Sequence, residues 1–360
     1  MFLIFEVMNS FKRNLLIALL LPIQILIVRC IGTKTAWIEH YYSNGIYIPI
    51  SKTLRFLFGW IPFSVGDVLG LILLFLLLKN ICNLIASRFK NILPKTINFI
   101  AVLSLLHFVF YLFWGLNYFR EPLYKSLEFS KSKYSTEQLF KVTKKIATNF
   151  NEVHQEITNN DSVAVKIPIS RNLIYKLAPQ GFENLVKIYP QLSYSNPSVK
   201  SSLVSLFQSY NGTSGYFNPI SGEAQVNHQI PITSYPATTC HEIAHQIGWA
   251  AENEANFIGF LACIHHDNLY FKYAGYRMAF QYCIGELQKR DANLATQIKR
   301  QINRGIFKDY KNTYSHWKKY ENPIEPYIKK GYNSYLKANN QSKGIKSYNY
   351  VVDLLIAYYN

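Results

Sequence analysis

Three long apolar segments near the N-terminus constrain the fold of this chain more than any other feature. They run from about Asn14 to Ile31, from about Ile61 to Leu84 and from about Ile97 to Leu116. A helix needs roughly 20 apolar residues to cross the hydrocarbon core of a bilayer, and each segment approaches or exceeds that length. We therefore predict a region with three transmembrane helices in residues 1–120, with the lipid bilayer as its partner.

A cleaved signal peptide is the alternative for the first segment, because Lys12 and Arg13 precede the apolar run. No small-x-small cleavage site follows it, and a signal peptide would not explain the two later segments. Few polar residues interrupt the segments. Arg29 and Asp67 lie near segment ends, where the side chain can snorkel to the surface, whereas His107 lies deep and is expected to be a packing histidine with its hydrogen bonds satisfied.

Aromatic and basic residues at the segment ends indicate an orientation. Trp114, Tyr118 and Phe119 lie where an interfacial aromatic belt is expected. The N-terminus and the short loop between the second and third segments carry Lys12, Arg13, Lys79, Arg88, Lys90 and Lys95. The opposite side carries Lys34, Lys52, Arg55, Arg120 and Lys125. The density in the short loop predicts that the N-terminus is cytoplasmic and that everything after the third segment lies outside the cytoplasm.

The overall charge fits a membrane surface better than nucleic acid. The chain has 38 Lys and Arg against 21 Asp and Glu, a formal net charge of +17. There is no basic stripe, zinc finger or ribonucleoprotein motif in the sequence, so we predict no nucleic-acid partner. Five cysteines show no CxxC pairing, which argues against a disulfide framework or a cysteine-zinc site. Cys240 is expected to pack inside a helix.

Residues 121–360 are predicted to form a mostly helical soluble domain, because polar residues break every apolar run after Glu121-Pro122. A turn-rich stretch at 212–219, followed by residues 220–227, predicts a hairpin or an edge strand. The fragment at 212–215 is not a GxSxG elbow, so a serine hydrolase gains no support. Helices are predicted at about 139–150, 181–188, 198–207, 238–251, 255–265, 269–289, 292–306 and 350–359.

The motif His241-Glu242-Ile243-Ala244-His245 predicts a zinc site. Its two histidines are four residues apart, so on a helix both imidazoles face the same side and can bind one Zn²⁺. Such a zinc ion activates a bound water, and Glu242 beside it is placed to act as the general base. The alternative is an amphipathic helix that matches the pattern by chance.

A catalytic zinc needs a third protein ligand, and two acids follow the motif. Glu252 would lie about 10 Å further along an unbroken helix, too far to bind the same ion. Gly248 can end the first helix so that the chain turns and brings Glu252 back, with Glu254 as the alternative ligand. The histidines held in reserve, each expected on the surface, are His228, His265 and His266.

At these residues the chain resembles the gluzincin metallopeptidases, in particular membrane peptidases related to the CAAX prenyl protease and to a bacterial heat-shock protease. Those proteins have HExxH on one helix and ExxAD on a later one, whose first Glu binds zinc. Here 252–256 reads Glu-Asn-Glu-Ala-Asn, with Asn256 in place of the Asp and a shorter gap between the motifs. The resemblance implies that Glu252 is the third ligand.

Segments 62–67, 114–120, 215–227, 241–246 and 254–257 resemble a bacterial membrane family, the domain of unknown function numbered 3810. This resemblance implies three spans in the bacterial inner (cytoplasmic) membrane and a zincin-like α+β domain. In zincins an edge strand above the active-site helix binds the substrate backbone. The resemblance therefore makes Gly215, Tyr216, Phe217 and Asn218 the candidate substrate-binding residues.

Two functions follow from these observations. The first is a membrane-anchored zinc metallopeptidase that cleaves polypeptides, and the second is an inactive zincin-fold scaffold or partner-binding protein. Candidate donors to the oxyanion of the reaction are Tyr276, Arg277 and Tyr348. No sequence feature indicates an oligomeric state.

Overall fold

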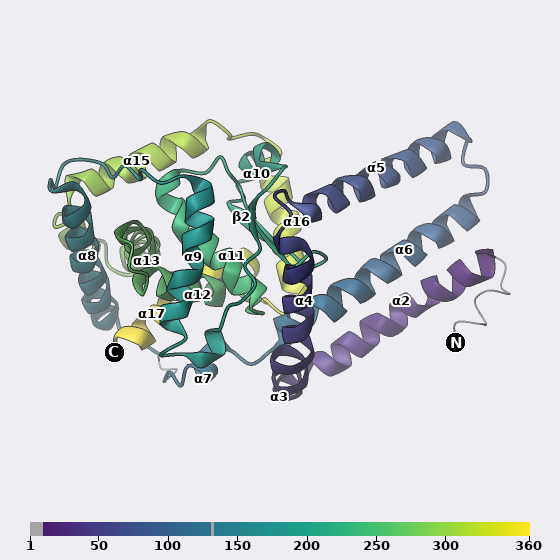
Figure 1. Ribbon diagram of the computed structural model, residues 1–360, viewed down its shortest axis with the longest axis horizontal. Helices are drawn as coiled ribbons and strands as arrows, with labels where there is room; N and C mark the ends of the chain where they lie inside the picture. Colours follow the sequence, from purple (N-terminus) through teal and green to yellow (C-terminus); the bar gives the residue numbers. More distant parts are fainter. Residues whose placement is uncertain (1–9, 131–132) are drawn as a thin grey trace.

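The computed structural model describes residues 10–130 and 133–360, and helices dominate it (Figure 1). Three long helices, α2 (Ser10–Gly32), α5 (Val65–Ala86) and α6 (Ile92–Phe113), project together from one side of the rest of the molecule. Each is long and apolar enough to cross a membrane, as predicted. The third ends before the predicted Leu116, because the backbone leaves the helical region at Trp114, where φ is −161°.

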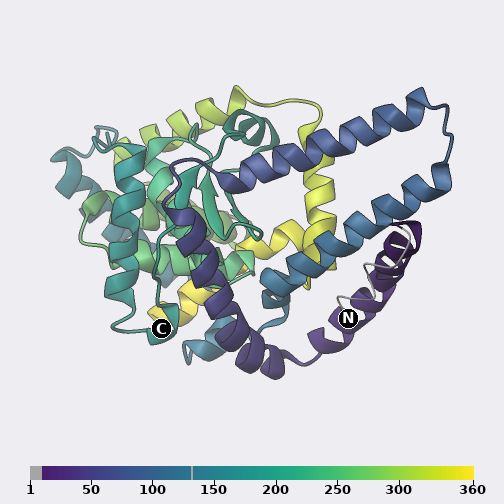
Figure 2. The ribbon, with the colours of Figure 1, turned by 45° about the vertical axis from the view of Figure 1, so that its right-hand side comes forward.

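Within the projecting arm, α2 packs along α6, whereas α5 lies apart from both (Figures 1 and 2). Polar side chains pair between α2 and α6. Gln24 donates to the Ser104 hydroxyl and contacts Nδ1 of His107 at 3.0 Å. His107 is therefore a packing histidine with a hydrogen-bond partner, as expected, since its ring pairs with Gln24 between the two helices.

The segment between α2 and α5 packs against the C-terminal part of the chain. It contains α3 (Thr35–Trp37), the π-helix η1 (Ile38–Ile46) and α4 (Tyr47–Gly59). Side chains of Tyr47, Ser51 and Arg55 all donate hydrogen bonds to the carbonyl oxygen of Gln246. This segment, which the sequence groups with the transmembrane region, is therefore attached to the helix that carries the histidine motif.

The C-terminal part is a helical assembly around one apolar core. Its helices are α7 (Leu123–Ser126), α8 (Thr136–Thr158), α9 (Arg171–Leu185), α10 (Ser205–Asn211), α11 (Tyr235–Gln246), α12 (Glu252–Ile264), α13 (Leu269–Arg290), α14 (Ala292–Lys299), α15 (Arg304–Lys318), α16 (Glu325–Ala338) and α17 (Val351–Tyr359). Short 3₁₀ turns are η2 (Gly115–Phe119), η3 (Pro190–Leu192), η4 (Ile232–Ser234) and η5 (Gly344–Tyr350). The core centres on α12, which packs against α9, α11, α13 and α17 and is buried almost throughout.

A small sheet of three strands lies beside this helical core. Its order is β1 (Val199–Ser201), β3 (Glu223–Val226) and β2 (Gly215–Asn218), with β3 parallel to β1 and antiparallel to β2. The predicted hairpin is confirmed as β2 and β3, with β2 at the edge. The helix predicted over 198–207 is wrong, because the Ser198 carbonyl and the Ser202 amide pair with β3 and hold this stretch as a strand until α10 begins.

One face of the sheet is polar and lies under the first turn of α5. Glu223 accepts the backbone N–H groups of Val65 and Gly66 and pairs with the buried ammonium of Lys200. Asp67 accepts hydrogen bonds from the Ser202 hydroxyl and the backbone N–H of Leu203. The snorkelling prediction for Asp67 is therefore wrong, because its carboxylate is buried and fastens α5 to the sheet.

Candidate metal centre

The motif helix α11 and the following helix α12 are separated by a sharp turn. Helix α11 begins at Tyr235, with Pro236 in its first turn, and ends at Gln246, earlier than the predicted residue 251. Gly248 follows with a φ of +92°, a conformation that is strained for a residue with a side chain. Glu252 is the first residue of α12, so the turn brings its carboxylate back over α11 as the sequence predicts.

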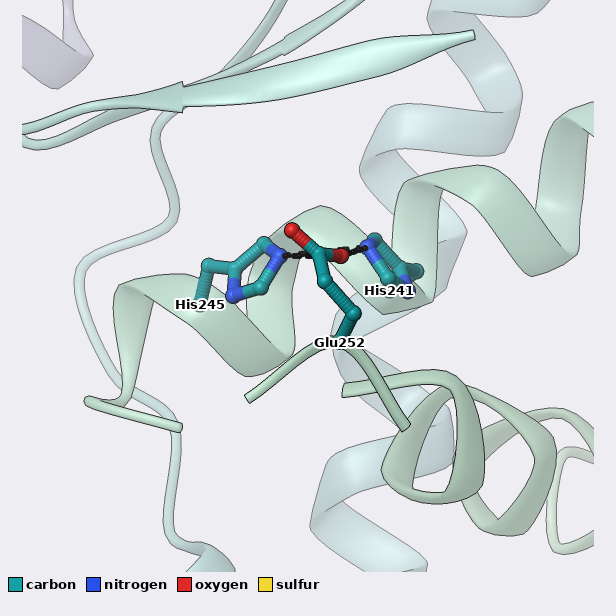
Figure 3. Close-up of side chains that lie close together, drawn as sticks. All are labelled: His241, His245 and Glu252. Carbon is teal, nitrogen blue, oxygen red and sulfur yellow. Dashed lines mark hydrogen bonds and ion pairs between the residues drawn. The ribbon is translucent and has the colours of Figure 1, made fainter. Parts of the chain in front are cut away.

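The side chains of His241, His245 and Glu252 converge on one point (Figure 3). The Nε2 atoms of the two histidines are 3.1 Å apart. Oε2 of Glu252 lies 3.3 Å from Nε2 of His241 and 3.5 Å from Nε2 of His245. A tetrahedral zinc with bonds of about 2.0–2.1 Å holds its ligand atoms about 3.3–3.4 Å apart. The three separations therefore fit the donor set of one zinc ion.

Neighbouring groups fix the orientation of two of these side chains. Nδ1 of His245 lies 2.7 Å from the carbonyl oxygen of Trp249. A carbonyl can only accept, so Nδ1 carries the proton and Nε2 presents its lone pair to the candidate site when the ring is neutral. The Tyr332 hydroxyl donates to Oε1 of Glu252 at 2.8 Å, which leaves Oε2 for the histidines. Such hydrogen bonds orient metal ligands in known sites.

The carboxylate of Glu252 and the imidazole of His245 perturb each other. Burial alone would raise the pKa of Glu252, but the two neighbouring histidines outweigh it and hold that pKa far below its usual range. Burial would lower the pKa of His245, yet the adjacent Glu252 carboxylate raises it to about 9. At neutral pH Glu252 is therefore ionised and His245 is protonated. A metal cation bound by the pair would replace the proton on His245.

Glu242 is the group best placed for proton transfer. Burial raises its pKa to about 7, against the lowering effect of His241 and His245. Its Oε2 atom is buried and makes no hydrogen bond with the described residues. Oε1 faces the edge strand, since a Cβ added to Gly215 would lie only 2.6 Å from it. A half-charged, unpartnered carboxylate near neutral pH is suited to accept a proton from water.

Glu254, the alternative third ligand, lies elsewhere. Its carboxylate accepts the backbone N–H of Leu123 at 2.7 Å, and burial raises its pKa to about 7. Geometry thus selects Glu252.

Of the reserve histidines, His228 is exposed, but the surface prediction for His266 is wrong, because its ring is buried, stacks on Phe271 and bonds to the Leu177 carbonyl. Neither belongs to the cluster of His241, His245 and Glu252.

Of the three candidate oxyanion donors, two make hydrogen bonds elsewhere and one lies near the cluster. Arg277 donates to the Ser234 and Thr313 hydroxyls, and the Tyr276 hydroxyl receives a hydrogen bond from Asn149. Tyr348 comes closer to the cluster, since its hydroxyl lies 3.2 Å from that of Tyr332, the residue bound to Glu252. Of the three, Tyr348 is therefore the one that the structure connects to the candidate site.

The end of α6 supports the cluster from the side of the apolar helices. The Trp114 indole N–H donates to the His245 carbonyl at 3.2 Å, and its ring packs edge-on against the His245 ring. Trp114 and Tyr118 are buried, so the prediction that they form an interfacial belt is wrong. Sequence reasoning missed Trp114, Tyr47 and Tyr332 as supports. No local sequence pattern could predict these three residues, because their contacts join parts of the chain that are distant in sequence.

Together, the fold and the cluster define a mainly helical protein with three helices of bilayer length and a group of side chains able to hold one metal ion. A family model described as "Protein of unknown function (DUF3810)" matches residues 42–356, so the chain belongs to that family. The matched region includes α5, α6, the sheet and the whole cluster. No curated protein and no solved structure matches the chain.

Proposed function

We propose that this protein is a zinc metallopeptidase anchored in a membrane by α2, α5 and α6. The observation that carries the proposal is the convergence of His241, His245 and Glu252 at zinc-ligand spacing, with the unpartnered carboxylate of Glu242 beside them. Two histidines and one glutamate leave a fourth position open, which is the arrangement of catalytic rather than structural zinc sites.

The chemistry expected here is peptide-bond hydrolysis. Zinc bound by this set would lower the pKa of a water molecule and polarise the substrate carbonyl. Glu242 accepts the proton of the attacking water and passes it to the leaving amine, for which its pKa of about 7 is well matched. Tyr332 and the Trp249 carbonyl keep the ligands oriented.

The edge strand β2 offers a binding surface for an extended substrate. Its hydrogen-bonded pairs with β3 fall at Tyr216 and Asn218, because the register continues from the bond between the Asn227 amide and the Ser214 carbonyl. The N–H and C=O groups of Gly215 and Phe217 therefore point away from β3. A polypeptide added along this edge would run past Glu242, whose Oε1 atom lies 2.6 Å from where a Cβ on Gly215 would be.

The membrane location rests on the surface of the three projecting helices. Leucine, isoleucine and phenylalanine side chains cover them and are largely exposed, including the run Leu71 to Leu78 on α5. Such an apolar surface is costly in water and favourable in hydrocarbon. We place the chain in the bacterial cytoplasmic membrane, with the C-terminal part outside the cytoplasm.

Metal analysis of the purified full-length protein is the first test. We expect about one zinc per chain in the wild type and in Glu254→Gln, and loss of zinc in Glu252→Gln and His245→Ala. Glu254 is the matched control, since it is a buried acid in the same turn of α12. Zinc loss from Glu254→Gln but not from Glu252→Gln would contradict the ligand assignment.

Glu242→Gln tests the reaction itself. This variant should keep its zinc and lose roughly 10²- to 10⁴-fold in cleavage rate, because the general base is removed. Comparing new peptide termini in membranes of cells that carry the wild type or Glu242→Gln provides the readout. Identical termini in both strains, with zinc bound in both proteins, would leave the non-enzymatic scaffold as the function.

A further inference from the structure

Helix α10 is amphipathic, but its polar side faces the protein and its apolar side faces outward, the opposite of a helix on the surface of a soluble domain. Its polar residues Ser205, Gln208 and Ser209 are buried, whereas Leu206 and Phe207 are 54% and 62% exposed. Leu203, just before the helix, is 53% exposed and continues the same apolar face. A helix that turns its apolar side outward indicates an apolar environment on that side.

The segment that leads into α10 lies beside the first turn of α5. The backbone N–H of Leu203 donates to the Asp67 carboxylate at 2.7 Å, and the Ser202 hydroxyl donates to the same group at 3.0 Å. Asp67 belongs to the first turn of α5. The segment before α10 is thus held against α5 about one turn before the exposed apolar run Leu71 to Leu78 begins.

This position coincides with the expected surface of the bilayer. Helix α5 has 22 residues and is about 33 Å long at 1.5 Å per residue, close to the roughly 30 Å thickness of the hydrocarbon core. Its first turn therefore lies near one boundary of that core. Trp60 and Phe63, in the loop that leads into α5, are also exposed at this level. Tryptophan favours the membrane interface.

We propose that α10, together with Leu203, Trp60 and Phe63, forms a docking surface that rests in the interfacial layer of the same bilayer that holds α2, α5 and α6. The continuity of this apolar surface with α5 identifies lipid as its occupant. The proposal depends on the anchoring of the three helices but not on catalysis. The docking surface holds the C-terminal part at a fixed height and tilt over the membrane.

Spin labelling of the full-length protein in lipid nanodiscs tests this docking. The starting protein carries Cys30→Ala and Cys82→Ala, since these two free cysteines are exposed and the other three are buried. Single labels are placed by Phe207→Cys on α10, by Phe75→Cys on α5 and by Val163→Cys. Val163 is also exposed and apolar, but it contacts Gly305 at the start of α15, at the end of the molecule away from the projecting helices (Figure 1).

Relaxation by oxygen and by a water-soluble nickel complex reports the depth of each label. We expect the ratio of relaxation by oxygen to relaxation by the nickel complex to be several-fold higher for the label at 207 than for the label at 163, and highest for the label at 75. A label at 207 that behaves as the label at 163 does, while that at 75 lies in lipid, would overturn the docking alone. A label at 75 exposed to the nickel complex would overturn the anchoring as well.

A second copy of the chain is the other occupant that the test distinguishes. Dilution of the labelled protein with unlabelled protein would then narrow the spectrum of the label at 207, because dipolar broadening between copies disappears. Such narrowing would overturn the proposal, whereas an unchanged spectrum supports lipid. Leu206→Cys, on the same exposed face, repeats the measurement should the label at 207 disturb the fold.

Discussion

The carboxylate of Glu252 has a different neighbour at each oxygen atom. Oε2 faces the two imidazoles, and Oε1 accepts the hydrogen bond of Tyr332. Tyr332 comes from α16, 80 residues beyond Glu252 in the sequence, and the motif histidines come from α11. The short motif predicts the two histidines and Glu242 as site residues, and the expected turn at Gly248 predicts Glu252. The tyrosine could not be predicted, because nothing in its local sequence records that contact.

Tyr332→Phe is expected to weaken zinc binding by roughly 10- to 100-fold, the usual effect of removing a hydrogen bond to a metal ligand. The freed Glu252 carboxylate can then rotate away from the histidines. Competition with a chromophoric chelator measures the affinity. Tyr327→Phe on the same helix is the control, since that side chain is 75% exposed. Equal affinities for both variants would show that Tyr332 does not position Glu252.

Zinc binding should release a proton from His245. The pKa of His245 is raised to about 9 in the metal-free protein, so at pH 7 the ring is protonated and must lose that proton to bind the ion. The apparent affinity should therefore rise about tenfold per pH unit between pH 7 and the pKa of about 9, and level off above it. Calorimetry in buffers of different ionisation enthalpy gives the proton count, and an affinity that does not change with pH would contradict this assignment.

At the scale of elements, helices were predictable where the apolar periodicity is strong, and so was the local hairpin of β2 and β3, but the pairing of β1 with β3 was not. The apolar helices, α8, α11 to α13 and α17 all follow from sequence patterns, whereas β1 was mistaken for a helix. The predicted helix at 292–306 is divided into α14 and α15, and the predicted 181–188 helix begins at Arg171 as α9. Strand β1 is three residues long and exists only because β3 pairs with it, which no local window contains.

Gly248→Ala should destabilise the turn between α11 and α12. The φ of +92° is strained for alanine, and the added Cβ would lie 2.9 Å from the Tyr47 ring. We expect a loss of about 1–3 kcal/mol in the free energy of unfolding, seen as a lower melting temperature of the detergent-solubilised protein. Gly285→Ala is the matched control. It lies within α13 with open space around it and should stabilise by about 0.5–1 kcal/mol. Equal shifts would argue against strain at the turn.

At the scale of the whole molecule, the basic residues from which the orientation is predicted are not equivalent. Arg120 forms an ion pair with Glu39 at 2.6 Å, and Arg55 is buried against the Gln246 carbonyl. Both lie on the side of the C-terminal part, so the free basic charge there is smaller than the sequence suggests. The other ends of the three helices have Arg88, Lys90 and Lys95 in or near a short loop. Their basic charge therefore predicts a cytoplasmic location for these ends more strongly than the sequence count alone does.

Cysteine labelling of intact cells should confirm that orientation. In the protein lacking Cys30 and Cys82, a membrane-impermeant maleimide should modify Val163→Cys from outside and reach Lys90→Cys only after the cells are opened. Both positions are exposed, so accessibility within the protein does not distinguish them. The reverse pattern would place the side chains of His241, His245 and Glu252 on the cytoplasmic side.

The hydrogen bond between Trp114 and the His245 carbonyl has a consequence for which bonds this protein can reach. Trp114 is the first residue beyond α6, so a single indole ring lies between the end of that helix and His245, a candidate metal ligand. An extended polypeptide advances about 3.3 Å per residue. Under the proposed function, a substrate rooted in the same bilayer would be cut close to the point where it emerges, and its distal parts would lie beyond reach.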